Sequence, residues 1–459
     1  MSDTITNSSA VDENQKETQA DTSAGRPNAK PSKSGLYTIV WRWHFYAGIL
    51  SAPILWMITI TGAMYVFSTE ISEWRDQALL KVSPQEEERV SYDRLREIAA
   101  SHAASEDLEG MVVRSDPAHS VFFLAHIEGE PGNRADDQHQ RIYLNPYDGS
   151  LLGTRIAEHD FFAVVLELHR SLMLGTTGRI LSELVTCWGL ILLASGFYLW
   201  WPRGKKNAGV WLPRIKGKFY AVLRDWHAVS GFYLLPLIGI IAFTGLFFTL
   251  VLGTGFNTTA KKMGHWPPEW FLTAEAPAPS PEAQPLKLDQ VVPLFLEHSR
   301  SGEDAVAIRF AEKPELAHKA FYMIDDDKNS LRTVSVNQYT GEKFSILDPP
   351  DLPFLYRVRL WAVSIHMGKI FGMPTKILAL IASLGLLGLS VTGIWMWWKR
   401  RPTGRSGFPR APLPQSLPAW GWALMIVVGI LLPVAGVSIL LICLLDWICF
   451  SQLRKKKAA

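Results

Sequence analysis

Four apolar runs, each long enough to cross a lipid bilayer, constrain this chain more than any other feature. They cover residues 45–67, 179–201, 228–252 and 376–398. About 20 helical residues span a hydrocarbon layer roughly 30 Å thick. Because lipid offers no partner for a backbone N–H or C=O group, a helix is the conformation that satisfies each run internally. The sequence therefore predicts a polytopic α-helical membrane protein.

A further apolar segment covers residues 420–450. At about 31 residues it is longer than one minimal span and short of two, and Pro433 and Gly436 lie near its middle. A single crossing would put the basic tail 451–459 outside, whereas a hairpin would return it to the cytoplasm. The charge bias slightly favours the hairpin, and both arrangements stay open.

Basic residues gather in the two short connections that follow the second and fourth runs. Residues 202–224 hold seven lysines and arginines and no acid, and residues 399–419 are similarly basic. The positive-inside rule places both loops in the cytoplasm, and no nucleic-acid partner is expected from these charges. The polar tail 1–34 is then a disordered cytoplasmic segment without a signal-peptide core. The long connections 70–168 and 254–365 lie in the periplasm.

The order of helix, long connection and helix occurs twice. The expected membrane helices are 36–67, 169–201, 225–252 and 366–398, the second and fourth with a preceding outer segment. Each long connection contains an amphipathic helical pattern, then strand-like runs, then a matching turn, Asn145–Gly149 or Asn337–Gly341. The clearest strand-like runs are residues 121–127 and 141–144, then 305–310, 320–324 and 331–336. The sequence predicts a duplicated architecture with two small α+β periplasmic domains.

Four histidines occupy matched positions in the two halves. His44 and His227 each begin an H-x-x-x-G pattern at the start of a membrane helix, and a Thr-Gly pair follows each at the same offset. His169 and His366 each begin an H-x5-G pattern ahead of the next helix. Imidazole is the commonest metal ligand, and ionisable side chains at membrane depth are functional candidates. The pattern predicts two bis-histidine haems, one near each membrane face.

The spacing of the second pair leaves two arrangements open. His169 and His366 each precede a tryptophan by 31 residues, which is roughly 45 Å of continuous helix and exceeds the hydrocarbon layer. Either the second haem lies at the headgroup level, or the helix breaks at Gly175–Gly178 and at Gly372–Pro374. Readings with one haem or none also stay open, because a histidine at a helix end often only hydrogen-bonds a carbonyl.

Three cysteines, Cys187, Cys443 and Cys449, form no C-x-x-C pattern, so any haem is held non-covalently, and b-type haem is the form expected. Arg42, Arg224 and Arg170 lie beside the histidines and are candidates to bind haem propionates, with simple interfacial anchoring as the alternative. The remaining histidines show no metal-ligand spacing and are expected on the solvated surface: His102, His119, His126, His139, His159, His265, His298 and His318.

Together these features resemble the PepSY-associated transmembrane proteins, which include iron-regulated membrane proteins and inner-membrane siderophore reductases. The resemblance rests on the histidine-led helices, the N-x-Y-x-G turns and the G-x-x-x-W-W endings at Gly196 and Gly393, and it covers about residues 36–401. It implies PepSY domains in the periplasm of a Gram-negative bacterium. In the reductase branch it further implies haem-mediated delivery of electrons to ferric siderophores.

The sequence thus predicts an inner-membrane haem-containing reductase that passes electrons from an unidentified donor to a periplasmic acceptor such as a ferric siderophore. Its partners would be membrane lipids, the donor and the acceptor, and no catalytic residue is assigned beyond the haem ligands. No flavin- or nicotinamide-binding domain is evident, so the donor would be separate. The alternative is a non-enzymatic, membrane-anchored PepSY module with a binding or regulatory role.

Overall fold

A computed structural model describes most of the chain and allows these expectations to be compared with a structure. It describes residues 35–86, 88–105, 108–129, 137–203, 209–267, 274–276, 280, 282–300, 303, 305–324, 327–404, 407–409 and 419–458. The predicted disordered tail, residues 1–34, lies outside the described residues, as do residues 204–208, 405–406 and 410–418 of the two basic loops.

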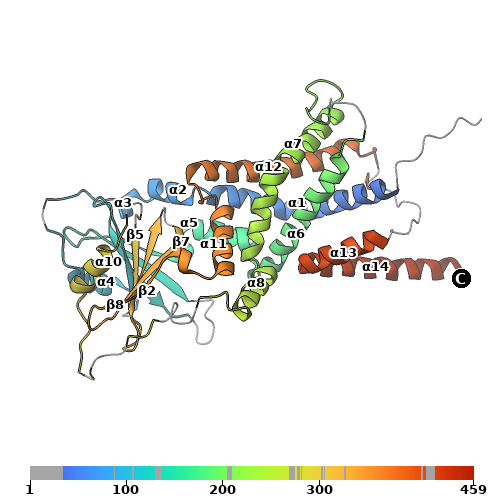
Figure 1. Cartoon of the computed structure of the whole chain (residues 1–459). Helices are drawn as coiled ribbons and strands as arrows, with labels where there is room; N and C mark the ends of the chain where they lie inside the picture. The colour runs from blue at the N-terminus through green and yellow to red at the C-terminus, as the bar shows by residue number, and fades with distance from the viewer. Residues whose placement is uncertain are drawn as a thin grey trace, which may run out of the picture.

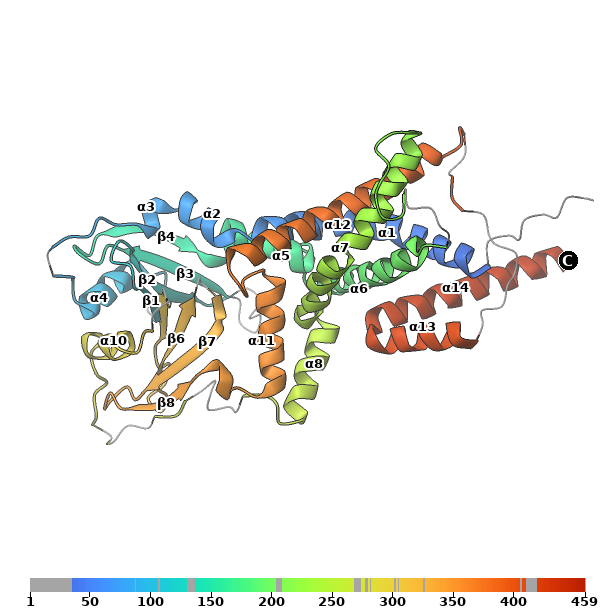
Figure 2. The same ribbon diagram turned by 45° about the horizontal axis from the view of Figure 1, so that its top comes forward.

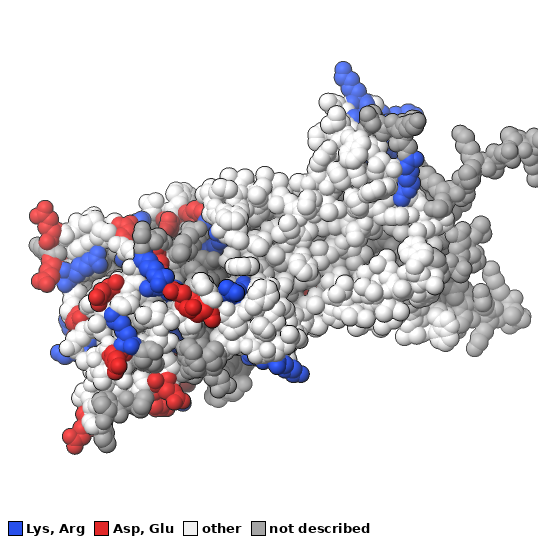
Figure 3. Space-filling view, in the orientation of Figure 1, with Lys and Arg blue, Asp and Glu red and all other residues white. Residues whose placement is uncertain are grey.

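Among the described residues, four helices are long and apolar enough to cross a membrane, which confirms that the chain is a membrane protein. They are α1 (Gly35–Tyr65), α6 (Gly175–Trp200), α7 (Phe219–Gly245), which a 3₁₀ turn continues to Phe248, and α12 (Met373–Arg400). Both α1 and α7 pack against α6 and α12, so the four helices form one bundle (Figure 1). Charged side chains gather over the sheet domain and at the far ends of the helices, and the face between them is mostly uncharged (Figure 3).

Each half of the chain bends sharply before its second membrane helix. Helix α5 (Phe161–Ser171) ends in left-handed residues at Leu172 and Met173, with φ of 55° and 60°, before α6 begins. Helix α11 (Phe354–His366) precedes α12 across Gly368 and Gly372, whose φ values are also positive. Of the two arrangements left open by the spacing, the broken helix is therefore the one present.

The break separates each of these membrane helices from the outer segment expected before it. His169 and His366 lie in that segment, in the last turn of α5 and at the end of α11. The α5–α6 corner closes tightly, because a Cβ on Gly178 would come within 1.5 Å of the Ser171 carbonyl oxygen. Only glycine fits at that position.

The two long connections form a single eight-stranded antiparallel sheet in the order β4-β3-β2-β1-β5-β6-β7-β8. The strands are β1 (Leu108–Arg114), β2 (Val121–Ile127), β3 (Gln138–Leu144), β4 (Leu151–Ile156), β5 (Ala305–Arg309), β6 (His318–Ile324), β7 (Asp327–Val336) and β8 (Lys343–Leu347). The expectation of two separate α+β domains is corrected by this sheet. Strand β1 pairs with β5 from Gly110–Arg309 to Arg114–Ala305, which satisfies backbone groups that two separate domains would leave at open edges.

Helices α4 (Tyr92–His102) and α10 (Leu288–Leu296) cover one face of this sheet (Figure 2). Residues such as Leu95, Phe123 and Val291 are fully buried in the core between these helices and the sheet. The two helices also cap each other. The Asp93 carboxylate accepts from the backbone N–H groups of Leu288 and Asp289 at 3.1 Å, and the Asp289 carboxylate accepts from the N–H of Tyr92 at 2.5 Å. Core and caps thus join the halves on the side away from the bundle.

The C-terminal apolar segment consists of two helices, α13 (Ala419–Leu431) and α14 (Pro433–Ala458), which lie side by side (Figure 2). They approach closely at Gly429 and Gly436, since a Cβ on Gly436 would lie 2.7 Å from the Cα of Gly429. Small residues are what such close helix packing requires. On which side of the membrane each end lies stays a prediction.

The joint between the halves depends on a glycine. A Cβ on Gly110 would lie 2.3 Å from the Ile308 carbonyl oxygen on β5. We expect Gly110→Val to force β1 and β5 apart and to lower the free energy of unfolding by about 1–3 kcal/mol. Denaturant unfolding of the purified protein in detergent measures this. Thr154→Val, on the exposed face of edge strand β4, is the control and should leave stability nearly unchanged; equal stability of both variants would contradict the close approach.

Candidate functional site

The bundle brings together two histidine pairs, each with one ring from each half of the chain. The rings of His44 on α1 and His227 on α7 lie 6.4 Å apart between centroids, at an interplanar angle of 89°. The rings of His169 on α5 and His366 on α11 lie 6.1 Å apart at 53°. These are the two pairs that the sequence analysis proposed.

The Nδ1 atom of each ring is held by the half of the chain to which the ring belongs. His169 Nδ1 lies 2.9 Å from the carbonyl oxygen of Ile58, and His366 Nδ1 lies 2.8 Å from that of Ile241. A carbonyl only accepts, so both nitrogens carry the proton and donate. Among the described residues, no hydrogen bond engages the Nε2 of these two rings.

The other pair is held by hydroxyl groups in the same manner. His44 Nδ1 lies 2.9 Å from Ser195 Oγ on α6, and His227 Nδ1 lies 3.0 Å from Thr392 Oγ1 on α12. Each hydroxyl donates its own proton to a carbonyl of its helix, Ser195 to Leu192 at 3.2 Å and Thr392 to Gly388 at 2.7 Å. Its oxygen therefore accepts from the ring, and in the described part of the chain Nε2 again makes no hydrogen bond.

A glycine on a neighbouring helix supports each ring. A Cβ on Gly196 or Gly393 would lie 3.2 or 3.5 Å from the Cε1 of His44 or His227. A Cβ on Gly62 or Gly245 would lie 3.1 or 2.7 Å from the Cε1 of His169 or His366. The glycines of the G-x-x-x-W-W and Thr-Gly motifs are thus explained by the histidines that lie on them.

His44 and His227 open into a cavity of about 780 Å³ between the ends of α1, α6, α7 and α12. Its lining is mostly apolar and aromatic and includes one tryptophan of each W-W motif, Trp200 and Trp397, whereas the adjacent Trp201 and Trp398 are exposed. The size falls within the ~300–1,000 Å³ that ligand and cofactor sites commonly occupy.

The candidate arginines fall in different places. Arg224 lines the cavity and pairs with the buried Asp225 at 2.6 Å. Arg42 is not among the cavity-lining residues, and Arg170 is exposed beside His169. Arg400, which the sequence analysis did not select, lines the cavity with its guanidinium 4.7 Å from the Trp41 ring. Its position at the end of a G-x-x-x-W-W-x-R motif could have indicated it as a site residue.

The sequence match with known families covers the whole of this arrangement. The PepSY-associated TM region matches residues 41–400, from the helix that carries His44 to Arg400 at the cavity. This chain belongs to the PepSY-associated transmembrane family. The resemblance inferred from the motifs is thereby confirmed. No curated protein matches the chain significantly in sequence.

In this family member the two histidine pairs lie at different depths. Fourteen residues of α1 separate His44 from Ile58, whose carbonyl holds His169, and fourteen residues of α7 separate His227 from Ile241, whose carbonyl holds His366. At 1.5 Å per residue the pairs are therefore offset by about 21 Å along the bundle. The His169–His366 pair is the one nearer the sheet domain.

The sequence analysis did not identify Glu183, a buried carboxylate of the helix bundle. Glu183 on α6 is fully buried and accepts from the backbone N–H groups of Val251 and Leu252 at 2.8 and 2.9 Å. These groups begin α8 (Val251–Lys262), so the carboxylate compensates unpaired donors and the positive end of that helix. Its role is structural.

The histidines of the sheet domain are not all on the solvated surface, which corrects that expectation. His318 is buried, and its Nδ1 accepts from the backbone N–H of Ala311 at 3.0 Å. Burial, with a smaller effect of Arg96, lowers the pKa of His318 to about 4. His126 and His139 lie together with Glu109, an arrangement that the sequence spacing did not indicate.

Two glycines of α7 allow a matched test of the ring support. In Gly245→Ala the new Cβ would meet the His366 ring, which cannot move aside without losing its bond to Ile241. We expect a loss of about 1–3 kcal/mol of stability. In Gly239→Ala the Cβ would meet nothing within 4 Å, so stability should rise slightly or stay constant, because alanine favours helix. Denaturant unfolding in detergent compares the two, and an equal effect would contradict the support role.

Proposed function

We propose that this family member is a haem-containing reductase of the bacterial inner membrane, which delivers electrons to an acceptor on the side of the sheet domain. Under this proposal His44 and His227 hold one non-covalent b-type haem, and His169 and His366 hold a second. The observation that carries the proposal is the spacing of the four rings together with the free Nε2 of each.

The ring spacing fits two axial ligands of one metal. An imidazole nitrogen binds a first-row metal at about 2 Å and lies roughly 1 Å from its ring centroid, so opposed ligands place their centroids about 6 Å apart. The two pairs have 6.4 and 6.1 Å. Two rings joined by a direct hydrogen bond would have centroids only about 5 Å apart.

The hydrogen bonds at Nδ1 prepare each ring as a ligand. Since Nδ1 donates to Ile58, Ile241, Ser195 or Thr392, the lone pair of the neutral ring is on Nε2. Such second-shell bonds fix the tautomer and orientation of metal-binding histidines. A histidine that only capped a helix end would not require a second histidine ring about 6 Å away.

The cavity walls suit a flat, largely apolar group with an acidic edge. Gly48 and Gly231 leave space one helical turn beyond His44 and His227, and aromatic side chains such as Trp200 keep water from the rings. Arg224 and Arg400 supply cations that can pair with propionates, whereas Arg42 does not line this cavity. Arg170 follows His169 directly and is the candidate for a propionate of the second haem. Haem held by His44 and His227 would supply one-electron chemistry.

Charge and topology support the proposed direction. The basic loops begin beyond Trp200 and Trp397, at the end of the bundle opposite the sheet domain, so the positive-inside rule favours a periplasmic sheet domain. The His169–His366 pair would then face the acceptor. Family resemblance favours ferric iron in a siderophore, where reduction weakens oxygen ligation, and the matched halves are consistent with an internal duplication. The electron donor would be a separate partner.

The first test of the proposal is the visible spectrum of the purified protein. We expect a Soret band that shifts on reduction and two haems per chain. His44→Ala and His227→Ala should each remove the same one of the two haems, because the two rings share it, and exposed His102→Ala is the control. A colourless but folded protein would favour the alternative, a membrane-anchored binding or regulatory module. Additive losses in the double variant would contradict the pairing.

A second test concerns direction. In reduced protein embedded in vesicles, His169→Ala or His366→Ala should slow reoxidation by an impermeant ferric chelate, about tenfold or more, when the chelate is added on the side of the sheet domain. Stopped-flow absorbance at the Soret band measures the rate. The His44 signal should persist in these variants and serves as the control for folding. A rate equal to that of the unmodified protein would contradict the proposed route.

A further inference from the structure

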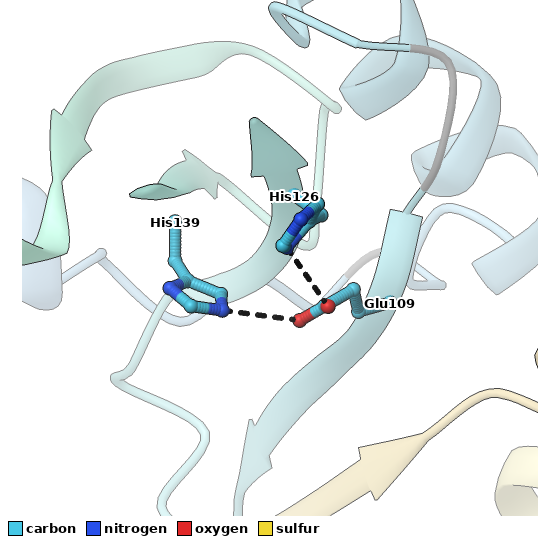
Figure 4. Close-up of side chains that lie close together, drawn as sticks. All are labelled: Glu109, His126 and His139. Atoms are coloured by element: carbon cyan, nitrogen blue, oxygen red, sulfur yellow. Dashed lines mark ion pairs between the residues drawn. The ribbon is translucent and has the colours of Figure 1, made fainter. Parts of the chain in front are cut away.

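A cluster of two histidines and one glutamate lies on the sheet face opposite α4 and α10. His126 on β2 and His139 on β3 are direct cross-strand partners, with ring centroids 5.4 Å apart. Glu109 on β1 reaches the same place, and the three side chains point toward one another (Figure 4). None of them takes part in the proposed haem sites.

A β-bulge directs Glu109 to this cluster. Leu108 and Met111 both lie in the core on the other face, although they are three residues apart, and the pairing of β1 with β2 shifts register between Leu108 and Gly110. An extra residue in one strand re-aims its side chain. The strand thus departs from regular alternation at the residue that completes the cluster.

The distances suit a single cation. His126 Nδ1 lies 3.3 Å from one Glu109 oxygen, His139 Nε2 lies 3.7 Å from the other, and one ligand atom from each residue lies within 4.8 Å of those of the other two. Ligands that each bind a metal at about 2 Å are separated by roughly 3–4 Å. Small side-chain rotations are enough to bring all three to one ion.

The surroundings orient the ligands and add negative charge. Glu158 accepts from His139 at Nδ1, 2.8 Å, and at the backbone N–H, 3.0 Å, which turns Nε2 toward Glu109. Asp137 lies 3.9 Å from His126 Nε2. His126 Nδ1 is shielded from solvent and makes no hydrogen bond to any described residue. A shielded nitrogen that lies near a carboxylate without a hydrogen bond to it is costly, and an ion between the two would satisfy both.

We propose that Glu109, His126 and His139 bind a divalent first-row transition-metal ion. Two imidazoles and one carboxylate suit iron(II), zinc or related ions and disfavour magnesium and calcium, which prefer oxygen ligands. Metal binding here does not depend on the haem proposal. If the reductase function holds, we expect ferrous iron, because it would be formed on the same side of the membrane. The two sites are also close along the chain. Glu158, which holds His139, lies three residues before Phe161, and α5 rises only about 12 Å from Phe161 to His169.

Zinc titration of the full chain tests the proposal without interference from haem iron. The protein, without a histidine tag and treated with a chelator, is titrated with Zn²⁺ in detergent by calorimetry, and bound zinc is counted by elemental analysis. We expect one zinc per chain. His126→Ala and His139→Ala should weaken its binding about a hundredfold or more, and the shape-conserving Glu158→Gln about 10–100-fold. Exposed His102→Ala should bind as the unmodified protein does.

Two results would overturn the metal site: absence of stoichiometric zinc, or unchanged affinity in the Glu158→Gln and histidine variants. Thermal unfolding of each variant separates loss of the site from loss of the fold. His44→Ala should keep its zinc affinity whatever its spectrum. A colourless protein that binds zinc would reject the haem proposal and leave the metal site intact.

Discussion

The hydrogen bond that each paired histidine donates from Nδ1 to its own half of the chain is the interaction on which the site depends. An imidazole at membrane depth cannot rely on water, so its proton must be given to a protein acceptor. Two rings use the carbonyls of Ile58 and Ile241, and two use hydroxyls whose own protons are already committed. Each half therefore orients its own rings, and contact between the halves only has to bring the oriented rings together.

Much of this arrangement was predictable because it repeats. The apolar runs determine the membrane helices, and the equal offsets of His44 and His227 or of His169 and His366 already indicated the pairing. The Thr-Gly and G-x-x-x-W-W motifs can also be seen in the sequence. The role of their glycines cannot be predicted from it, because a glycine that packs under an imidazole and a glycine at a helix contact give the same pattern.

Other features depend on contacts between distant segments, and the sequence pattern carries little trace of them. Strand β1 lacks regular alternation because of the bulge at Glu109, and β4 and β8 are short edge strands, so all three were missed. The sequence also did not indicate that the strands of both halves form one sheet, because that depends on the pairing of β1 with β5. His126 and His139 are thirteen residues apart in sequence and become neighbours only through β2–β3 pairing. Glu183 carries no motif, since its partners are backbone groups.

The continuous sheet has a consequence for symmetry. A chain that ended after α6 would leave β1 as an open edge and would hold one ring of each histidine pair. Only a second copy, related by a twofold axis through a β1–β1 contact, could complete the sheet and both pairs at once. The full chain joins both halves in one polypeptide. A side-chain cluster such as Glu109, His126 and His139 can therefore lie in one half without a matching cluster in the other.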